Sequence, residues 1–233
     1  MSEPTVAAAS TTTATPKASR WTRQLRGLYA ITPDIVDIAQ LVAKVEAAIA
    51  GGAQVIQYRN KTATPSLRRK QAAMLSRVCD GGGALFVVND DAALAREVGA
   101  AGVHLGEDDG DVARAREIGG EAMLIGVSCY NDLALARRLV GEGADYVALG
   151  SFYLSPTKPG ARRAEPALLH RAKKLSVPVV AIGGITAANG RALVEAGADA
   201  LAVITDVFDH DDPAKITHAA AAIVACFDPE PED

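Results

Sequence analysis

The stretch Ala84-Leu-Phe-Val-Val-Asn89-Asp90-Asp91 decides the fold, because an apolar run ends there abruptly at an amide and two carboxylates. A short apolar run rich in branched and aromatic residues is typical of a buried parallel strand. The same pattern returns one strand-and-helix unit later, as Gly102-Val-His-Leu-Gly-Glu-Asp-Asp109. Two neighbouring strands are therefore predicted to deliver carboxylates to the same edge of a sheet.

Asp90 and Asp109 at this edge are predicted to hold Mg²⁺, whose preferred ligands are hard oxygens such as carboxylates, phosphates and waters. The structural alternative is that Asp90 or Asp91 caps the following helix, while the Asp108-Asp109 pair lies in a solvated turn. The polar residues elsewhere in the chain favour the metal site.

Strand-like and helix-like segments alternate from Gly27 onward. Eight strand–helix units in about two hundred residues predict an α/β fold, a single-domain (β/α)8 TIM barrel. The rival is an open doubly wound sheet, which usually has fewer strands and a glycine fingerprint after the first strand, and that fingerprint is absent here. Besides the two strands above, strands are predicted at 28–31, 54–57, 123–127, 145–149, 178–182 and 200–203, and helices at 36–50, 65–79, 92–98, 111–118, 132–141, 166–174, 186–196 (capped by Thr186) and 213–226.

The composition indicates one large domain. The 233 residues are 49% hydrophobic and carry a formal net charge of -4 without any basic block, which argues against a nucleic-acid partner. No apolar run reaches the length of a membrane span, and three scattered cysteines indicate neither a disulfide framework nor a zinc site, so we expect a cytoplasmic protein. Residues 1–20 are predicted to be a disordered extension, 21–227 the catalytic barrel, and 228–233 a disordered acidic tail.

Polar side chains gather at the predicted carboxyl ends of the strands, where barrel enzymes carry their chemistry. Arg59, Lys61 and Lys158 would repel one another at one mouth unless an anion neutralised them, so a polyanionic substrate is implied. Gly183-Gly184 and Ile204-Thr205 follow the seventh and eighth strands, where barrels commonly bind phosphate through backbone amides. The alternatives are a solvated loop for Arg59 and Lys61, and a turn that only needs φ > 0 for the two glycines.

Six motifs stand at these strand ends: Gln57-Tyr-Arg-Asn-Lys61, Asn89-Asp90, Gly102-Val-His-Leu-Gly106 through Asp109, Gly126-Val-Ser128, Ser155-Pro-Thr-Lys158 and Ile182-Gly-Gly-Ile185. In this order and spacing they resemble the thiamine-phosphate synthase (thiamine phosphate pyrophosphorylase) family, from about residue 29 to residue 225. The resemblance implies a transferase that joins hydroxymethylpyrimidine diphosphate to thiazole phosphate. The products are thiamine phosphate and diphosphate, and the reaction uses one Mg²⁺ per subunit.

The resemblance also implies a role for each matching residue. Asp90 and Asp109 would ligate the Mg²⁺ that holds the diphosphate. The partners would be these two small molecules, with no nucleic acid and no membrane, and a homo-oligomer is left open. The pyrimidine diphosphate is assigned to Gln57, Tyr58, Arg59, Asn60, Lys61, Asn89, Ser128 and Lys158, and the thiazole phosphate to Ser155, Pro156, Thr157, Gly184, Ile204 and Thr205.

The chain departs from the family pattern at Glu107, Tyr130 and Asp206, where glutamine, histidine and a small residue are usual. The expected chemistry is departure of diphosphate followed by attack of the thiazole nitrogen, which calls for charge neutralisation rather than a protein nucleophile. In keeping with that, no Ser-His or Cys-His pair is evident: His104 is interpreted as a hydrogen-bonded barrel residue, and Cys129 has no activating neighbour. The rivals are a thiazole tautomerase-like isomerase, a Schiff-base aldolase using Lys158, and a non-catalytic phosphate-binding regulator.

Overall fold

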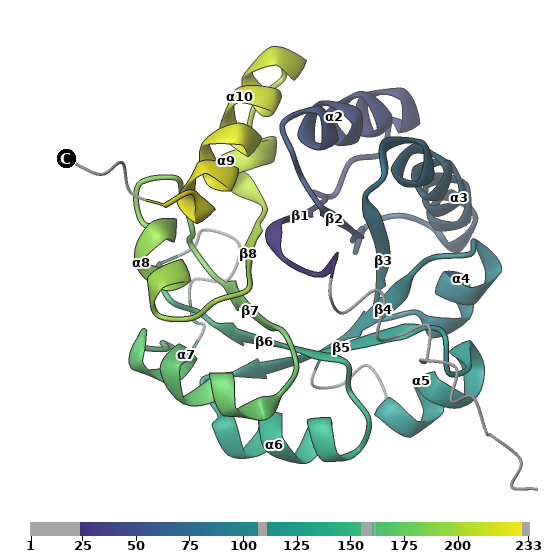
Figure 1. The fold of residues 1–233 in the computed structure, drawn as a ribbon. Coiled ribbons are helices and arrows are strands. Elements are labelled where there is room, and N and C mark those ends of the chain that lie inside the picture. Colours follow the sequence, from purple (N-terminus) through teal and green to yellow (C-terminus); the bar gives the residue numbers. More distant parts are fainter. Residues whose placement is uncertain (1–23, 107–110, 155–159, 161, 230–233) are drawn as a thin grey trace, which may run out of the picture.

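Eight parallel strands close into a barrel in the computed structural model, which describes residues 24–106, 111–154, 160 and 162–229. Each strand pairs with the next, and the first pairs with the last, so the strands form a ring around the axis seen in Figure 1. The predicted (β/α)8 architecture is confirmed. The strands are β1 (Gly27–Ile31), β2 (Val55–Tyr58), β3 (Leu85–Asn89), β4 (Gly102–Leu105), β5 (Leu124–Tyr130), β6 (Tyr146–Gly150), β7 (Val179–Ile182) and β8 (Ala200–Val203).

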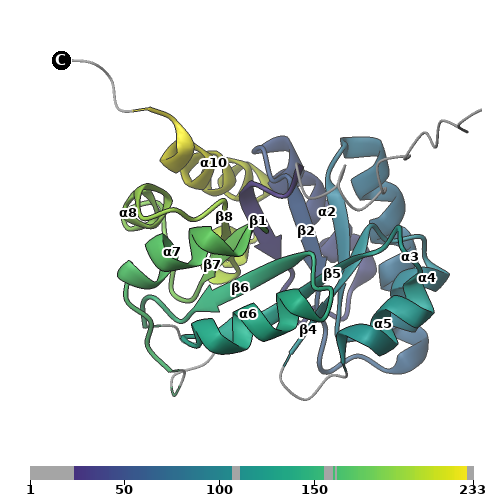
Figure 2. The same ribbon diagram turned by 60° about the horizontal axis from the view of Figure 1, so that its bottom comes forward.

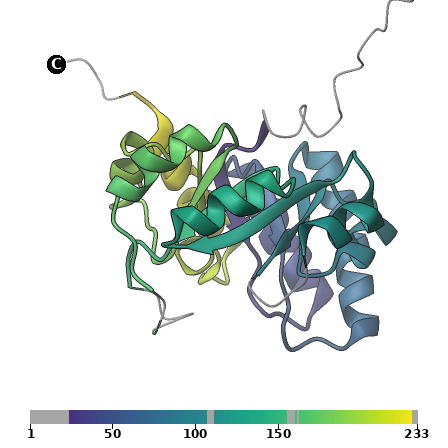
Figure 3. The same ribbon diagram turned by 90° about the horizontal axis from the view of Figure 1, so that it is seen from below.

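Helices surround the strands on the outside of this ring, as the turned views in Figure 2 and Figure 3 also show. Acidic or hydroxyl side chains set where most of them begin, because the side-chain oxygen accepts a hydrogen bond from a free backbone N–H of the first turn. Asp37, Thr64, Asp91, Asp111, Asp132 and Asp212 act in this way. The helices are α2 (Ile38–Ala50), α3 (Pro65–Gly82), α4 (Ala92–Glu97), α5 (Val112–Gly119), α6 (Leu133–Gly141), α7 (Ala167–Ala172), α8 (Gly190–Glu195), α9 (Thr205–Phe208) and α10 (Pro213–Val224), with 3-10 turns η1 (Lys173–Leu175) and η2 (Ala225–Phe227).

The strand residues divide between two apolar cores because successive side chains point to opposite faces of a strand. Leu28 and Ile56 belong to the larger core between the barrel and its helices, whereas Tyr29 and Val55 belong to the smaller core inside the barrel. The inner core holds two large aromatic residues, Tyr29 and Tyr146, both fully buried. The interior of the barrel is therefore filled by side chains.

A buried lysine joins α2 to the segment that follows β8. Lys44 of α2 donates from Nζ to the carbonyl oxygen of Phe208 at 3.0 Å and to that of His210, and it lies 3.6 Å from a carboxylate oxygen of Asp211. Carbonyl oxygens at the end of a helix carry partial negative charge, so the ammonium of Lys44 is well matched to the end of α9. This contact fixes α9, which lies next to the mouth of the barrel.

Several predicted element boundaries are wrong in an informative way. β5 runs to Tyr130 instead of ending at residue 127, so Ser128 lies within the strand and not after it. The helix expected to begin at Thr186 begins at Gly190; the Thr186 side chain caps nothing, and its backbone N–H instead donates to Asn189. The short helix α9 was not predicted, since four residues are too few to show a helical period.

None of the helices in the described part of the chain combines the length and the apolar character that crossing a membrane requires. The predicted extension over residues 1–20 lies outside the described residues.

Candidate active site

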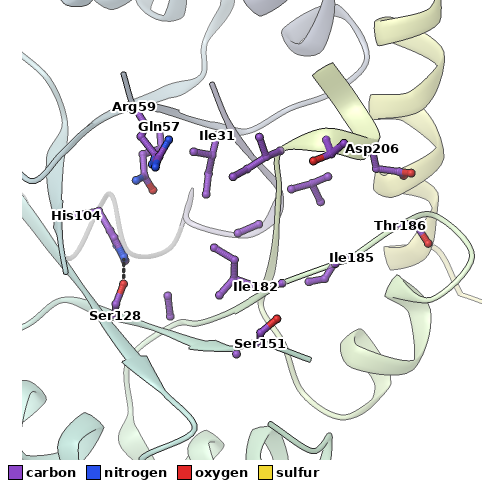
Figure 4. A pocket seen from close by; sticks show the side chains of 18 of the residues that line it. Ile31, Gln57, Arg59, His104, Ser128, Ser151, Ile182, Ile185, Thr186 and Asp206 are labelled. Carbon is purple, nitrogen blue, oxygen red and sulfur yellow. Dashed lines mark hydrogen bonds between the residues drawn. The ribbon is translucent and has the colours of Figure 1, made fainter. Parts of the chain in front are cut away.

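A cavity of about 470 Å³ opens at the carboxyl ends of the strands. The last residues of six strands line it, together with side chains from the loops that follow. Gln57, Arg59, His104 and Ser128 lie on one side of this cavity, and Ile185, Thr186 and Asp206 lie on the other, as Figure 4 shows. The six strand ends are Ile31, Asn89, Tyr130, Gly150, Ile182 and Val203.

The motif from Gln57 to Lys61 divides between two cavities. Gln57 and Arg59 line the large cavity, whereas Tyr58, Asn60 and Lys61 line a neighbouring one of about 50 Å³. Successive side chains of a strand point to opposite faces, which explains why Tyr58 lines a different cavity from Gln57 and Arg59. The predicted binding residues of this motif therefore do not all meet in one space.

Tyr58 and Asn60 have structural partners on α3. The Tyr58 hydroxyl donates to the Oε1 atom of Gln71 at 2.8 Å, and Asn60 Nδ2 donates to the same oxygen at 3.1 Å. The Asn60 Oδ1 atom accepts from the backbone N–H groups of Thr62 and Ala63 and so shapes the start of the next loop. Both side chains are buried, and Gln71, which the sequence reading missed, organises them.

Asp34 and Thr32, also missed by the sequence reading, hold the loop after β2. Thr32 Oγ1 exchanges hydrogen bonds with the backbone of Arg59, at 2.9 Å from the nitrogen and 3.0 Å from the oxygen. The Asp34 carboxylate lies 3.3 Å from Nη1 of Arg59 and accepts from the backbone N–H of Lys61 at 2.9 Å. Asp34 therefore forms an ion pair with Arg59 and holds the backbone of Lys61 in place.

Asp90 and Asp91, which the sequence left as alternative caps, have different roles. Asp91 caps α4 by accepting from the N–H of Leu94. Asp90 has a positive φ of 65° and ion-pairs with the ammonium of Lys61, while the Nδ2 atom of Asn89 donates to it. A non-glycine residue at positive φ is uncommon, and here the conformation turns the carboxylate toward a cation at the rim.

Ser128 and His104 form a hydrogen-bonded pair, which the sequence analysis did not foresee. Ser128 Oγ lies 3.0 Å from Nε2 of His104, because β4 and β5 pair side by side with His104 opposite Gly126. The other ring nitrogen contacts the hydroxyl of Tyr146 at 3.1 Å. The pair differs from a nucleophilic triad, in which a carboxylate orients the histidine, because a neutral phenol stands in that position. His104 is thus a hydrogen-bonded barrel residue, as predicted, and also part of the cavity wall.

Cys129 lies next to this pair in sequence but on the opposite face of β5. Burial raises its pKa from the ordinary value of 9.0 to about 12, and the nearby Asp132 carboxylate adds to the effect. A thiol with this pKa stays protonated at neutral pH and is a poor nucleophile.

The predicted phosphate loops both reach the large cavity. Gly184, Ile204 and Thr205 line it. Gly183 and Gly184 have φ values of 106° and 62°, and a Cβ on either would come within 2.2 Å of residues 151–154. Glycine is therefore required here for two reasons, the backbone conformation and the close approach of the loop after β6.

Asp206 and Tyr130, two of the three departures from the family pattern, also line the cavity. The Asp206 carboxylate accepts from the N–H of Ala187 at 3.2 Å, so it bridges the loop after β7 and the start of α9. The guanidinium of Arg162 lies 5.4 Å from the centre of the Tyr130 ring, a cation–π contact at the rim.

Other predicted site residues lie outside the described residues: Glu107, Asp109, Ser155, Pro156, Thr157 and Lys158. The described residues contain no cluster of three or more potential metal ligands, and Asp90 is the predicted metal ligand that falls among them.

A closed (β/α)8 barrel with a cation, amides and glycine loops around a cavity at its carboxyl end has the arrangement by which barrel enzymes bind anionic small molecules. A model of the thiamine monophosphate synthase family matches residues 28–207. The thiamine-phosphate synthase of Thiobacillus denitrificans is 50% identical over 208 residues, covering 89% of this chain and 97% of the relative. That of Chromobacterium violaceum is 51% identical, covering 85% and 96%.

Solved structures agree with the sequence relatives. Thiamine phosphate pyrophosphorylase from Pyrococcus furiosus superposes with a TM-score of 0.77 at 32% identity, covering 88% of this chain and 96% of that one. The chain belongs to the thiamine monophosphate synthase family, whose members are transferases of thiamine biosynthesis.

Proposed function

We propose that this protein joins hydroxymethylpyrimidine diphosphate to thiazole phosphate, with release of diphosphate, and that the large cavity holds both substrates. The observation that carries the proposal is the division of that cavity. Amide, hydroxyl and cationic side chains line one side, and glycine loops line the other. The pyrimidine diphosphate and the thiazole phosphate therefore have separate surfaces to bind, on opposite sides of a cavity of about 470 Å³.

The pyrimidine diphosphate is placed on the side of β2 to β5. Gln57, Asn89 and Ser128 offer hydrogen bonds to the ring, and Arg59 offers charge to the diphosphate. Lys61 is half exposed and stands beside the large cavity, where its ammonium is able to exchange the Asp90 carboxylate for an incoming phosphate. The binding roles of Tyr58 and Asn60 are proposed to be indirect, through the shape of this loop, and Lys158 is proposed as a further cation.

The thiazole phosphate is placed on the side of β7 and β8. Gly184, Ile204 and Thr205 line this part of the cavity, and backbone N–H groups in such loops are suited to a phosphate. Ser155, Pro156 and Thr157 are proposed to complete the site. The thiazole nitrogen then forms a bond to the methylene carbon of the pyrimidine substrate, and the bond from that carbon to the diphosphate oxygen breaks.

Mg²⁺ is proposed as the cofactor, held by Asp90 and Asp109. The fit rests on Asp90, whose carboxylate at the rim is already turned toward a positive charge, the ammonium of Lys61. Mg²⁺ commonly binds through one or two carboxylates and completes its shell with substrate phosphate and water. When bound, it would supply positive charge to the departing diphosphate.

The remaining catalytic work falls to groups of the protein that neutralise and orient. Arg59 and Lys61 stabilise the negative charge that develops on the departing diphosphate. Gln57 and Ser128 keep the pyrimidine ring aligned with the thiazole nitrogen. No protein nucleophile is needed, which agrees with the protonated state of the Cys129 thiol. The free thiols of Cys79, Cys129 and Cys226 support a reducing, cytoplasmic location, and a homo-oligomer is compatible with the proposal.

One assay tests the function. Purified protein is incubated with both substrates, with and without Mg²⁺, and thiamine phosphate and diphosphate are measured. We expect equal amounts of the two products, only with the metal and only when both substrates are present. Diphosphate release without thiazole phosphate, or binding of both ligands without any product, would contradict the proposal.

A further inference from the structure

A line of hydrogen bonds crosses the interior of the barrel beneath the cavity. It begins at Ser128 on β5, passes through His104 on β4 and Tyr146 on β6, and continues to Tyr29 on β1. The two phenol oxygens are 2.9 Å apart. We call the complete series the interior hydrogen-bond line; after Tyr29 it runs through Gln57 (2.9 Å), Asn89 (2.6 Å) and Asp90.

Chemistry fixes the direction of the bonds in this line from Asp90 as far as His104. A carboxylate paired with the ammonium of Lys61 has no proton to give, so the Asn89 amide donates to it through Nδ2. The Oδ1 atom of Asn89 is then the acceptor for Nε2 of Gln57. The Gln57 oxygen is consequently turned toward Tyr29.

The same reasoning continues through the tyrosines. The single hydroxyl proton of Tyr29 goes to the Gln57 oxygen, so Tyr146 has to donate to Tyr29. With its own proton used, the Tyr146 oxygen accepts from Nδ1–H of His104. A neutral imidazole at position 104 then carries its proton on Nδ1, and its Nε2 lone pair accepts the hydroxyl proton of Ser128.

We propose that His104 is neutral and that Tyr29 and Tyr146 are positioning residues that impose this direction, so that Ser128 faces the cavity only as a hydrogen-bond acceptor and selects a substrate ring that carries an N–H donor there. Neither tyrosine lines the cavity, whereas Ser128, His104, Gln57 and Asn89 all do. The tyrosines therefore act through the residues above them. The substrate part of this inference rests on the proposed function; the direction of the bonds does not.

Burial makes the direction robust. Tyr29 and Tyr146 are 1% and 0% exposed, so water cannot replace a lost partner. Burial raises the pKa of both phenols well above the ordinary value, which keeps each one a neutral donor. The space for the Tyr146 ring is also built in, because a Cβ on Gly126 would lie 1.9 Å from the ring atom that carries the hydroxyl.

Nitrogen-15 NMR of histidine side chains in the full-length protein tests the direction without any substrate. The chain has four histidines, and a His104→Asn variant identifies the signals of His104. We expect neutral His104 to carry its proton on Nδ1. In Tyr29→Phe, Tyr146 loses its acceptor and is free to donate to His104, so the proton is expected to move to Nε2 through the effect of Tyr146 on the ring.

Tyr153→Phe is the matched control, because its hydroxyl donates to the carbonyl oxygen of Asn189, outside the interior hydrogen-bond line. It should leave the His104 proton on Nδ1. Wild-type His104 with its proton on Nε2, or a Tyr29→Phe variant that is folded and unchanged at His104, would overturn the proposal. The wild-type spectrum alone decides the direction, even where a variant fails to fold.

A kinetic arm tests the consequence for the substrate. Tyr29→Phe should raise the KM for the pyrimidine diphosphate by about tenfold and leave the KM for thiazole phosphate unchanged. An analogue with a ring carbonyl in place of the amino group should inhibit wild type poorly and Tyr29→Phe better. Equal inhibition of wild type and Tyr29→Phe by the analogue would overturn the selection by Ser128. A wild-type protein that shows the expected NMR result but has no activity would contradict the proposed function alone.

Discussion

Gly126 and Tyr146 lie directly opposite one another on β5 and β6, and the phenol ring fills the space that a side chain at position 126 would need. The inner core of the barrel is thus built around an aromatic residue on one strand and the lack of a side chain on its neighbour. The position of Tyr146 depends on this pairing, and the orientation of His104 depends on Tyr146.

Gly126→Ala should therefore destabilise the protein by about 1–3 kcal/mol, the usual cost of forcing an extra group into a packed core. Urea denaturation followed by circular dichroism measures the change. Gly141→Ala is the control, because this glycine ends α6 and a Cβ there meets no atom within 4 Å. That variant should be as stable as wild type or more stable, and an equal loss in both variants would refute the packing argument.

Asp90→Ala should lower turnover by about 10²–10³-fold, because charge stabilisation of the leaving group is lost. The comparison is Asp91→Ala, which removes the cap of α4 and should cost about 1 kcal/mol of stability with little loss of Mg²⁺-dependent turnover. Initial rates over a Mg²⁺ titration distinguish the two. Near-normal Mg²⁺-dependent activity in Asp90→Ala would remove Asp90 from the metal site.

Asp206→Asn should lower the KM for thiazole phosphate by roughly fivefold, about 1 kcal/mol of removed repulsion between two anions. The asparagine oxygen keeps the hydrogen bond from Ala187, so the two loops stay joined. Glu121→Gln makes the same change in net charge at an exposed turn before β5, and it should leave both KM values unchanged. A KM that rises in Asp206→Asn would show that the carboxylate assists binding.

Two buried thiols should make stability fall in alkali. Burial raises the pKa of Cys79 and of Cys129 from 9.0 to about 12, and a raised pKa means that folding favours the protonated form. Their contribution is complete below pH 9.0 and is lost as the pH rises toward 12. The free energy of unfolding of a Cys79→Ala, Cys129→Ala variant should therefore depend less steeply on pH above 9.0 than that of wild type. Parallel curves would contradict this account.

The sequence was sufficient for the barrel because buried parallel strands leave a strong local signal. Apolar runs such as 85–88 end at polar residues, and glycines close the helices before the next strand, so the strand order follows from the chain itself. The residues at strand ends that line the cavity, including Gln57 and Ser128, followed from the same rule.

The support beneath the cavity was beyond sequence reasoning for a physical reason. Tyr29 and Tyr146 are 117 residues apart, and nothing local to either residue indicates that their hydroxyls meet. The separate roles of Asp90 and Asp91 depend on a backbone angle that two adjacent aspartates do not reveal. A Ser-His contact between neighbouring strands is likewise visible only once the register of β4 and β5 is known.

The seam between β1 and β8 has a consequence for synthesis in the cell. β1 pairs with residues 200–203, so one of its edges has no neighbour until nearly the whole chain has left the ribosome. An unpaired edge of a strand is a template for joining other chains. A nascent polypeptide stalled before β8 therefore exposes an unpaired strand edge on β1. Fragments that end before β8 should aggregate rather than accumulate as stable partial barrels.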